Sequence, residues 1–305
     1  MKVLLCTQKP FAAEAVKGIE EILKAGGHEL VTLEKYTGKD EMIAAVKDAD
    51  AMIVRSDKVT ADVIAAAPNL KIVVRAGAGY DNLDLAACSE KGVVAMNTPG
   101  QNANAVAELA IGLMIYISRN QFTPGTGHEL AGRRIGIHAY GNVGRLVAAK
   151  AKALGMSVSA YDPFVPAEKM VEDGVEPAET IEAMYSSCDF ISLHIPAIAE
   201  TVGSIGRSLV GIMPKNACLL NTARKEVIDE EGLLDVLKER DDLKYVTDIA
   251  PDMAEEFEKC LGKRFFATPK KQGAETAEAN VNAGLAAARQ ICGFFATGCT
   301  KFKLN

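Results

Sequence analysis

A turn rich in glycine, between an apolar segment and a helix-like segment, is the feature of this sequence that most directly indicates chemistry. It spans residues 134–144, with the sequence RIGIHAYGNVG, and a helical pattern continues through 145–154. Such a turn lets a backbone approach a pyrophosphate closely, and the N-terminus of the following helix offers free N–H groups to the anion. Ala139 stands where the first glycine is usual, so an ordinary tight turn remains the alternative. The residues expected at the pyrophosphate are Gly141, Asn142, Val143 and Gly144.

An acidic residue follows at the position expected for binding an adenosine ribose. Segment Ser157–Tyr161 has a strand pattern, and Asp162 ends it about 20 residues after the glycine turn. A carboxylate there accepts hydrogen bonds from the ribose hydroxyls and repels a 2′-phosphate. We therefore expect NAD rather than NADP as the cofactor, the alternative being that Asp162 only forms a turn before Pro163.

Composition bounds the remaining function classes. The 305 residues are about two domains' worth of chain, with 49% hydrophobic and 24% charged residues. A net charge of −6 argues against binding to nucleic acid or to an anionic membrane surface. The seven cysteines form no CxxC pair, so we expect neither a metal site nor a disulfide framework. With no signal peptide and no long apolar run, the expected location is the cytoplasm.

Strand-like and helix-like segments alternate along the whole chain, which predicts βαβ units and parallel sheets. Eleven strands are many for one twisted sheet, so we expect two. Segment 103–118 is a long apolar helix between them, and a last helix over 276–297 is expected to pack back on the first unit. The expected strands are Val3–Cys6, Glu29–Leu33, Met52–Arg55, Ile72–Arg75, Val93–Asn97, Arg134–Ala139, Ser157–Tyr161, Phe190–Ile195, Ala217–Thr222, Tyr245–Ile249 and Arg264–Ala267.

Several motifs, in the right order over nearly the whole chain, resemble the D-isomer-specific 2-hydroxyacid dehydrogenases. Within that family the resemblance is to its phosphoglycerate dehydrogenase branch. The motifs are VRS at 54–56, KVTADVI at 58–64, VRAGAGYDNLD at 74–84, KGVVAMNTPG at 91–100, AEL at 107–109, SRN at 118–120, CDFISLHIP at 188–196 and NTARKEVID at 221–229.

The resemblance implies an α/β protein of two doubly wound parallel-sheet domains with a cleft between them. A flavodoxin-like substrate domain would comprise residues 1–98 and 282–305, and a Rossmann-type NAD domain residues 99–281. It also implies a homodimer formed largely through the NAD domain. We expect the C-terminal regulatory domain of longer relatives to be absent.

The same resemblance assigns roles at the cleft. Arg224 would bind the substrate carboxylate and polarise the carbonyl, for which the fork geometry of arginine is suited. Backbone N–H groups of Gly77, Ala78 and Gly79 would share that carboxylate. Asp248 would hold the nicotinamide carboxamide, and His194 would pack beside the cofactor without carrying a proton. Further cofactor contacts are expected at Thr201, Thr222, Ala223 and Gly273.

The acid/base pair is where this sequence departs from the family. Segment 268–273, TPKKQG, places Lys270 where the family has its histidine, and the paired glutamate would fall near Met253. Asp252 and Glu255 are the nearest acids. Either Lys270 transfers the proton, which we favour and which predicts an alkaline optimum for alcohol oxidation, or the active site has decayed. Free lysine has a pKa of about 10.4, so such a base needs burial or cationic neighbours.

Two arginines favour a phosphorylated substrate. Arg55 and Arg75 end adjacent predicted strands at the carboxyl edge, where open α/β sheets bind ligands, and both match arginines that bind phosphate in the phosphoglycerate dehydrogenases. Either one could instead pair with a surface acid. The implied reaction is NAD-dependent oxidation of D-3-phosphoglycerate to 3-phosphohydroxypyruvate, the first step of phosphorylated serine biosynthesis. The alternatives are a hydroxypyruvate, glyoxylate or other D-2-hydroxyacid reductase, and a catalytically silent NAD-binding module.

Overall fold

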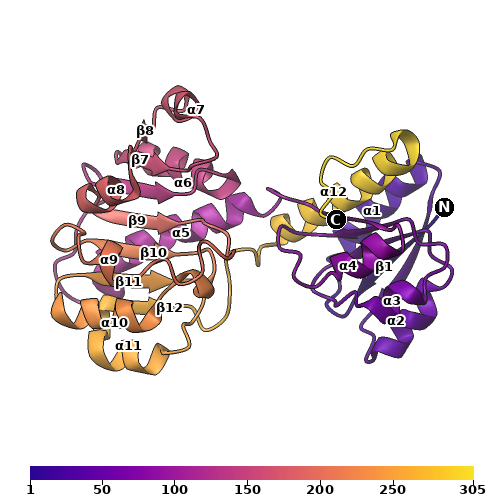
Figure 1. Ribbon diagram of the computed structural model, residues 1–305, viewed down its shortest axis with the longest axis horizontal. Helices are drawn as coiled ribbons and strands as arrows, with labels where there is room; N and C mark the ends of the chain where they lie inside the picture. The colour runs from indigo at the N-terminus through magenta and orange to yellow at the C-terminus, as the bar shows by residue number, and fades with distance from the viewer. The chain divides into compact units, whose positions relative to one another are not determined.

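The computed structural model describes residues 1–305 and consists of two compact units. Unit 1 contains Met1–Asn102 and Glu275–Asn305, and unit 2 contains Ala103–Ala274 (Figure 1). The boundaries expected from the sequence, after 98 and 281, therefore lie a few residues away from those observed. The second differs most, because the last helix begins at Ala277 and packs on unit 1 from its first turn.

Unit 1 is built on a five-stranded parallel sheet in the order β2-β1-β3-β4-β5, the flavodoxin-like order. Helix α12 lies beside α1 on this unit (Figure 1), and Ala283 and Ala287 of α12 pack with Ile19 of α1 and with the sheet. The strands are β1 (Lys2–Thr7), β2 (Glu29–Glu34), β3 (Ala51–Val54), β4 (Ile72–Arg75) and β5 (Val94–Asn97). The helices are α1 (Ala13–Ala25), α2 (Lys39–Val46), α3 (Ala61–Ala65), α4 (Leu85–Glu90) and α12 (Ala277–Thr297).

Unit 2 is built on a seven-stranded parallel sheet in the order β12-β11-β10-β9-β6-β7-β8. Counted from β6, this is the Rossmann order with one further strand. The strands are β6 (Arg134–His138), β7 (Ser157–Tyr161), β8 (Glu176–Pro177), β9 (Phe190–Leu193), β10 (Cys218–Asn221), β11 (Lys244–Thr247) and β12 (Phe265–Ala267). The helices are α5 (Ala103–Ser118), α6 (Asn142–Ala153), α7 (Ala167–Glu172), α8 (Ile181–Ser187), α9 (Arg207–Val210), α10 (Glu230–Glu239) and α11 (Ala254–Leu261).

Burial on both faces explains why these strands are apolar throughout. Every residue of β3, β9 and β10 is buried, as expected for central parallel strands covered by helices on both sides. The fold class predicted from the sequence is confirmed, and eleven of the twelve strands lie within or close to the expected ranges. The missed strand is β8, which has only two residues, one of them a proline.

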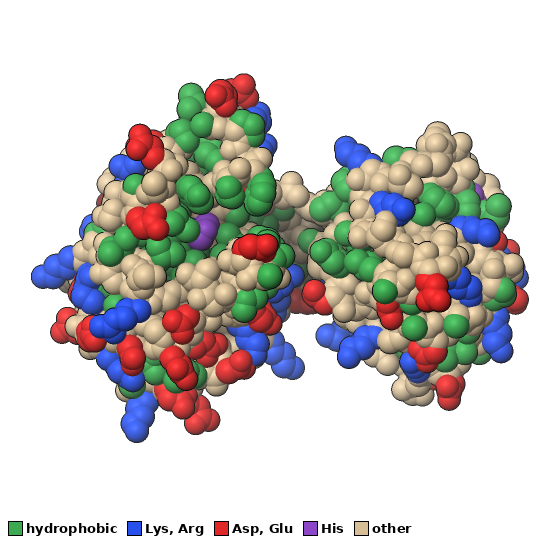
Figure 2. Space-filling view, viewed as in Figure 1, with side chains coloured by type: hydrophobic (Ala, Val, Ile, Leu, Met, Phe, Trp, Pro, Cys, Tyr) green, Lys and Arg blue, Asp and Glu red, His purple; other side chains and the backbone are tan.

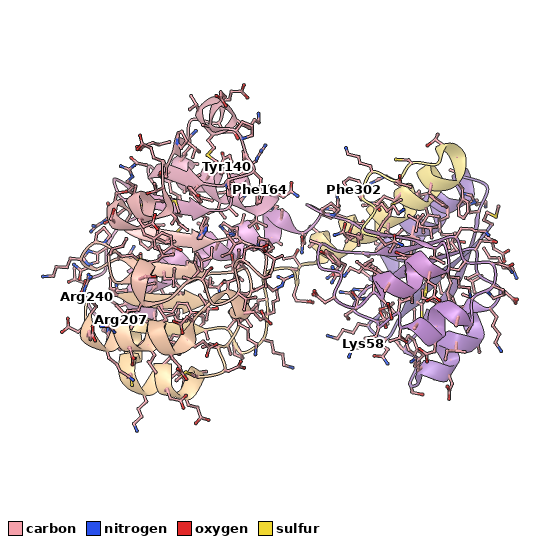
Figure 3. All side chains as sticks on the ribbon, viewed as in Figure 1. Lys58, Tyr140, Phe164, Arg207, Arg240 and Phe302 are labelled. Atoms are coloured by element: carbon pink, nitrogen blue, oxygen red, sulfur yellow. The ribbon has the colours of Figure 1, made fainter.

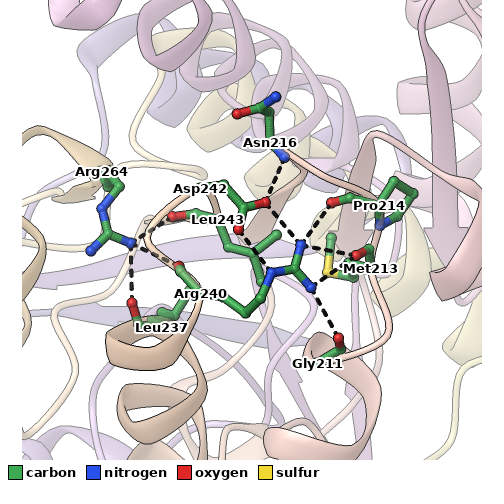
Figure 4. Close-up of polar contacts among 9 residues, drawn as sticks. All are labelled: Gly211, Met213, Pro214, Asn216, Leu237, Arg240, Asp242, Leu243 and Arg264. Carbon is green, nitrogen blue, oxygen red and sulfur yellow. Dashed lines mark hydrogen bonds and ion pairs between the residues drawn. The ribbon is translucent and has the colours of Figure 1, made fainter.

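Two arginines, Arg240 and Arg264, bind backbone carbonyls of unit 2 near the amino ends of its strands (Figure 4). The guanidinium of Arg240 donates to both carboxylate oxygens of Asp242 at 2.8 Å, and to the carbonyls of Gly211 and Met213. Arg264 donates to the carbonyls of Leu237, Arg240 and Leu243, which lie at and just beyond the end of α10. These groups satisfy helix-end carbonyls, so both arginines are structural.

Candidate active site

The glycine turn between β6 and α6 has the geometry of a dinucleotide turn. A Cβ atom on Gly144 would lie 2.3 Å from the carbonyl oxygen of Ala139, so only glycine permits this packing of helix on strand. A Cβ atom on Gly141 would meet nothing within 4 Å, which leaves the space in front of the helix open. Ala139 has φ +78°, the left-handed conformation that the usual glycine adopts without strain. Asn142 and Val143 begin α6, where N–H groups lack intrahelical acceptors.

Asp162 is fixed beside this turn. One oxygen of its carboxylate accepts the N–H of Tyr140 at 2.8 Å, and the other accepts the N–H of Phe164 at 2.9 Å. Tyr140 and Phe164 are labelled in Figure 3, and the Phe164 side chain is 89% exposed. The carboxylate expected at the ribose is thus tied to the turn expected at the pyrophosphate. Its role there remains a prediction.

Two histidines lie beside the turn: His138 is buried in β6, and His194, just after β9, is half-buried. His194 forms a hydrogen bond through Nε2 with the hydroxyl of Ser192, and its N–H donates to the carbonyl of His138. Burial lowers the pKa of His194 to about 3, and the neighbouring His138 lowers it further. Burial also lowers the pKa of His138 to about 4, against the opposing effect of Asp162. The lowered pKa values favour neutral imidazoles near pH 7, and the role of His194 as a packing residue beside the cofactor stays a prediction.

The loops after β9 and β10 contain the remaining residues expected near the cofactor. Thr222 is 4% exposed, and its hydroxyl has no hydrogen-bond partner in the chain. Ala223 is buried, with its N–H donated to the side-chain oxygen of Asn221. Thr201 accepts the N–H of Ile198 and donates to the carbonyl of Pro196, so its hydroxyl closes its own loop. The open space at the glycine turn and the unpaired Thr222 hydroxyl both fit a bound dinucleotide.

Arg224 has an ordered backbone and an uncompensated charge. The Asn221 side chain donates to the carbonyl of Arg224 at 2.8 Å, and so fixes the loop after β10. The guanidinium donates to the carbonyl of Ala223 at 2.9 Å and forms no ion pair within the chain. A half-buried arginine with remaining donors and no acid beside it is able to bind a carboxylate.

The loop that carries Lys270 is held by Asp248. This aspartate is fully buried at the end of β11, and one of its oxygens accepts the Thr268 hydroxyl at 3.0 Å and the Gln272 N–H at 2.8 Å. The other oxygen accepts the N–H of Gly273 at 2.8 Å. Lys270 itself is exposed on unit 2 and forms no hydrogen bond or ion pair. The structure therefore places Arg224, Asp248 and Lys270 in one unit, on loops that follow β10, β11 and β12.

In segment 252–255, where the family's glutamate is expected, one acid is already paired and the other is exposed without a partner. Asp252 forms an ion pair with Lys225 at 2.5 Å. Met253, at the position expected for that glutamate, donates its N–H to the Glu230 carboxylate at 2.8 Å. Glu255 lies in the first turn of α11, where an acid complements the helix dipole.

In unit 1, Arg55 and Arg75 lie at the carboxyl ends of the paired strands β3 and β4. The guanidinium of Arg55 contacts two backbone carbonyls and one side-chain amide, and it forms no ion pair within the chain. Arg75 donates from Nε to the carbonyl of Arg55 at 3.1 Å. The two arginines predicted to bind phosphate are thus adjacent, as the sequence indicated. Exposed Lys58 lies in the segment that follows β3 (Figure 3).

The turn after β4 offers fewer free donors than expected. The N–H of Gly77 already donates to the buried Thr98 hydroxyl at 2.6 Å, so only the N–H groups of Ala78 and Gly79 are without a partner. Gly77 has φ +145°, and a Cβ atom there would lie 1.5 Å from Nη1 of Arg75. This glycine therefore makes room for the Arg75 guanidinium.

Comparison with known proteins decides the family. The model of the D-isomer-specific 2-hydroxyacid dehydrogenase catalytic domain matches residues 5–305. The chain belongs to this family. A D-3-phosphoglycerate dehydrogenase of Methanocaldococcus jannaschii is 36% identical over 305 residues, which cover 95% of this chain and 57% of that protein. A hydroxypyruvate reductase of Thermotoga maritima is 39% identical over 67% of this chain and 70% of that protein.

Among solved structures of the family, the NAD⁺-bound 3-phosphoglycerate dehydrogenase of Entamoeba histolytica resembles this chain with a TM-score of 0.89. It is 50% identical, and the match covers 100% of this chain and 98% of that one. The chain thus spans a little over half the length of the curated relative from Methanocaldococcus and nearly all of the solved one.

Sequence reasoning on this 2-hydroxyacid dehydrogenase missed the polar residues that hold the site together. Asn221 fixes the loop that carries Arg224. The hydroxyl of Thr98 accepts the N–H of Gly77. Buried Asp57 accepts the Tyr36 hydroxyl and the Gln8 N–H at 2.7 Å each. A polar residue just after an apolar strand was the one signal in the sequence for these residues.

No helix of the structure is long and apolar enough to cross a membrane. On the face shown in Figure 2, acidic and basic side chains lie interspersed over α10 and α11.

Proposed function

We propose that this chain is an NAD-dependent D-3-phosphoglycerate dehydrogenase, which forms 3-phosphohydroxypyruvate in the first step of phosphorylated serine biosynthesis. The observation that carries the proposal is the pair of arginines at the ends of β3 and β4, with no acid bound to the Arg55 guanidinium. A substrate without phosphate has no need of two cations there. The match to the NAD⁺-bound Entamoeba enzyme supports the same substrate and cofactor.

The proposed chemistry assigns one task to each group. Arg55 and Arg75 bind the phosphate, while Arg224 and the free N–H groups of Ala78 and Gly79 bind the carboxylate. The neutral amine of Lys270 removes the hydroxyl proton as the C2 hydride leaves, and the alcohol becomes a ketone. NAD, when bound, accepts that hydride. Gly141, Asn142, Val143, Gly144, Asp162, His194, Thr201, Thr222, Ala223, Asp248 and Gly273 are the residues proposed to hold NAD.

Two other functions remain as alternatives with specific support. A hydroxypyruvate reductase is favoured by the similarity to the Thermotoga protein. A silent NAD-binding module is favoured because Lys270 stands in place of the family's histidine and Met253 stands near the position of its glutamate. The first predicts a preference for the unphosphorylated acid, and the second predicts NADH binding without turnover.

The test follows NADH by absorbance with phosphohydroxypyruvate, hydroxypyruvate, glyoxylate and pyruvate in parallel. The proposal expects the highest kcat/KM with phosphohydroxypyruvate. A higher value with hydroxypyruvate would assign the reductase function. If the fluorescence of NADH changes when the protein is added but NADH is not oxidised by any of these acids, the silent module is correct.

We further propose a cytoplasmic homodimer. All seven cysteines are free, which is usual in a reducing compartment. On unit 2, the Phe122 side chain is 69% exposed and Ile115 36%, so an apolar surface is available for a second copy. Light scattering at micromolar concentration tests this, because a monomer there would exclude a stable dimer.

A further inference from the structure

The Arg55 guanidinium is held by contacts on several sides. Both of its contacts from Nη1 are to backbone carbonyls, Lys9 at 3.1 Å and Pro10 at 3.2 Å. Nη2 donates to Oδ1 of Asn280 at 2.6 Å, and the Phe11 ring lies 5.1 Å below the guanidinium carbon. Of the five N–H groups of arginine, this leaves Nε–H and one Nη2–H as donors for an oxyanion.

Asn280 is itself oriented by the first turn of α12. Its Nδ2 donates to the carbonyl of Thr276 at 2.9 Å, so the amide presents Oδ1 to Arg55. Thr276 is the N-cap of the helix, and its hydroxyl accepts the Ala279 N–H at 3.1 Å. Because the observed boundary of unit 1 is Glu275, Asn280 and Arg55 belong to the same unit.

We propose that Asn280 is a positioning residue that sets selectivity for the phosphorylated substrate, an inference that rests on the proposed function. As a neutral acceptor it fixes the Nη2 group of Arg55 without neutralising its charge. The edge left for phosphate is thereby both oriented and cationic. A carboxylate at this position would orient the same group but would compete with the phosphate for it.

The main chain of Arg55 has contacts other than this one, so a positioning role can be tested apart from a structural one. The main chain of Arg55 is fixed independently, since its carbonyl accepts the Asn82 amide at 3.2 Å and the Arg75 Nε at 3.1 Å. An acid in the first turn of a helix is also favourable to that helix. We therefore expect Asn280→Asp to fold with an unchanged melting temperature.

The experiment compares Asn280→Asp, Asn280→Ala and Arg55→Ala with the wild type. With phosphohydroxypyruvate, we expect KM to rise about tenfold or more in Asn280→Asp and about threefold in Asn280→Ala, with kcat within about twofold. KM for unphosphorylated hydroxypyruvate should not change in either variant. The inhibition constant of inorganic phosphate against phosphohydroxypyruvate should rise in the same order, which a general loss of folding would not produce.

The outcomes distinguish this inference from the function on which it rests. If the wild type shows no preference for the phosphorylated acid and Arg55→Ala changes nothing, the proposed function fails and the inference fails with it. If Arg55→Ala raises KM but both Asn280 variants leave it unchanged, the function stands and the positioning role is wrong. If an Asn280 variant raises KM equally for both acids, the selectivity role is likewise wrong.

Discussion

The two units hold the cations proposed to act on the substrate in opposite ways. In unit 1 the guanidinium of Arg55 is itself bound, by two carbonyls, an amide and an aromatic ring. In unit 2 the side chain of Lys270 is exposed and unbonded, while Asp248 binds both ends of its loop at Thr268 and Gly273. Unit 1 therefore fixes the side chain of Arg55, whereas unit 2 fixes only the backbone of the loop that carries Lys270.

The difference follows from what each cation is proposed to do. A group that binds an anion gains affinity when its donors are already oriented, because less freedom is lost on binding. A proton carrier must instead reach the reacting oxygen within hydrogen-bond distance. Arg224 is intermediate, since Asn221 fixes its carbonyl and its guanidinium makes one contact with the chain.

Removing the side-chain amine of Lys270 should have the largest effect on kcat. We expect Lys270→Ala to lower kcat about a thousandfold, because the proton acceptor is lost. Lys270→Arg should be nearly as slow, since arginine keeps the charge but does not deprotonate. Stopped-flow absorbance with saturating NAD measures both, and NADH fluorescence should show unchanged cofactor affinity. If Lys270→Arg retains wild-type kcat, Lys270 acts through its charge alone.

Releasing the loop beneath Lys270 should have the next largest effect. Asp248→Asn replaces one buried oxygen by an NH₂ group that cannot accept the Gly273 N–H. We expect kcat to fall about a hundredfold through misplacement of Lys270, and the loop 268–273 to exchange its amide hydrogens faster. Thr268→Ser keeps the hydroxyl and is the matched control, whereas Thr268→Val removes it. Slower turnover without faster exchange would favour a direct contact of Asp248 with the nicotinamide.

Displacing the second arginine of unit 1 should have a smaller effect. In Gly77→Ala the new Cβ atom would occupy the place of Arg75 Nη1, and a φ of +145° would strain the backbone by about 2 kcal/mol. We expect KM for phosphohydroxypyruvate to rise about tenfold with little change for hydroxypyruvate. Gly92→Ala, also at positive φ but with open space around it, is the control for strain alone. An equal rise in KM in both variants would mean that Arg75 is not involved.

The smallest effect should come from a substitution in the glycine turn, and it should be on stability. Ala139→Gly relieves a left-handed alanine, and we expect the free energy of unfolding to rise by about 0.5 kcal/mol after the greater chain entropy of glycine is subtracted. Urea unfolding followed by circular dichroism measures the change, with NADH affinity unaltered. A loss of stability instead would show that the φ of +78° at Ala139 is unstrained.

Most of the fold was predictable because apolar strands and glycine turns are local signals. Helix 103–118 was expected at its observed bounds, whereas β8 was missed because two residues carry no periodicity. Site residues at strand ends were identified by their motifs. Their supports were not, since Asn280 lies 225 residues from Arg55 and Thr98 reaches Gly77 across two strand ends. Such contacts depend on tertiary structure that no local pattern contains.

The discontinuous path of unit 1 determines the order in which the molecule is completed during synthesis. Residues 1–102 leave the ribosome before unit 2, and α12 leaves it after unit 2. Until α12 docks on α1, the surface of α1 at Gly18 and Ile19 is exposed to solvent, and Arg55 lacks its contact with the Asn280 amide. Unit 2 is continuous and can fold while the rest is being made. The unit proposed to bind the substrate is therefore completed only after unit 2, and a nascent chain that still lacks α12 already contains the entire glycine turn.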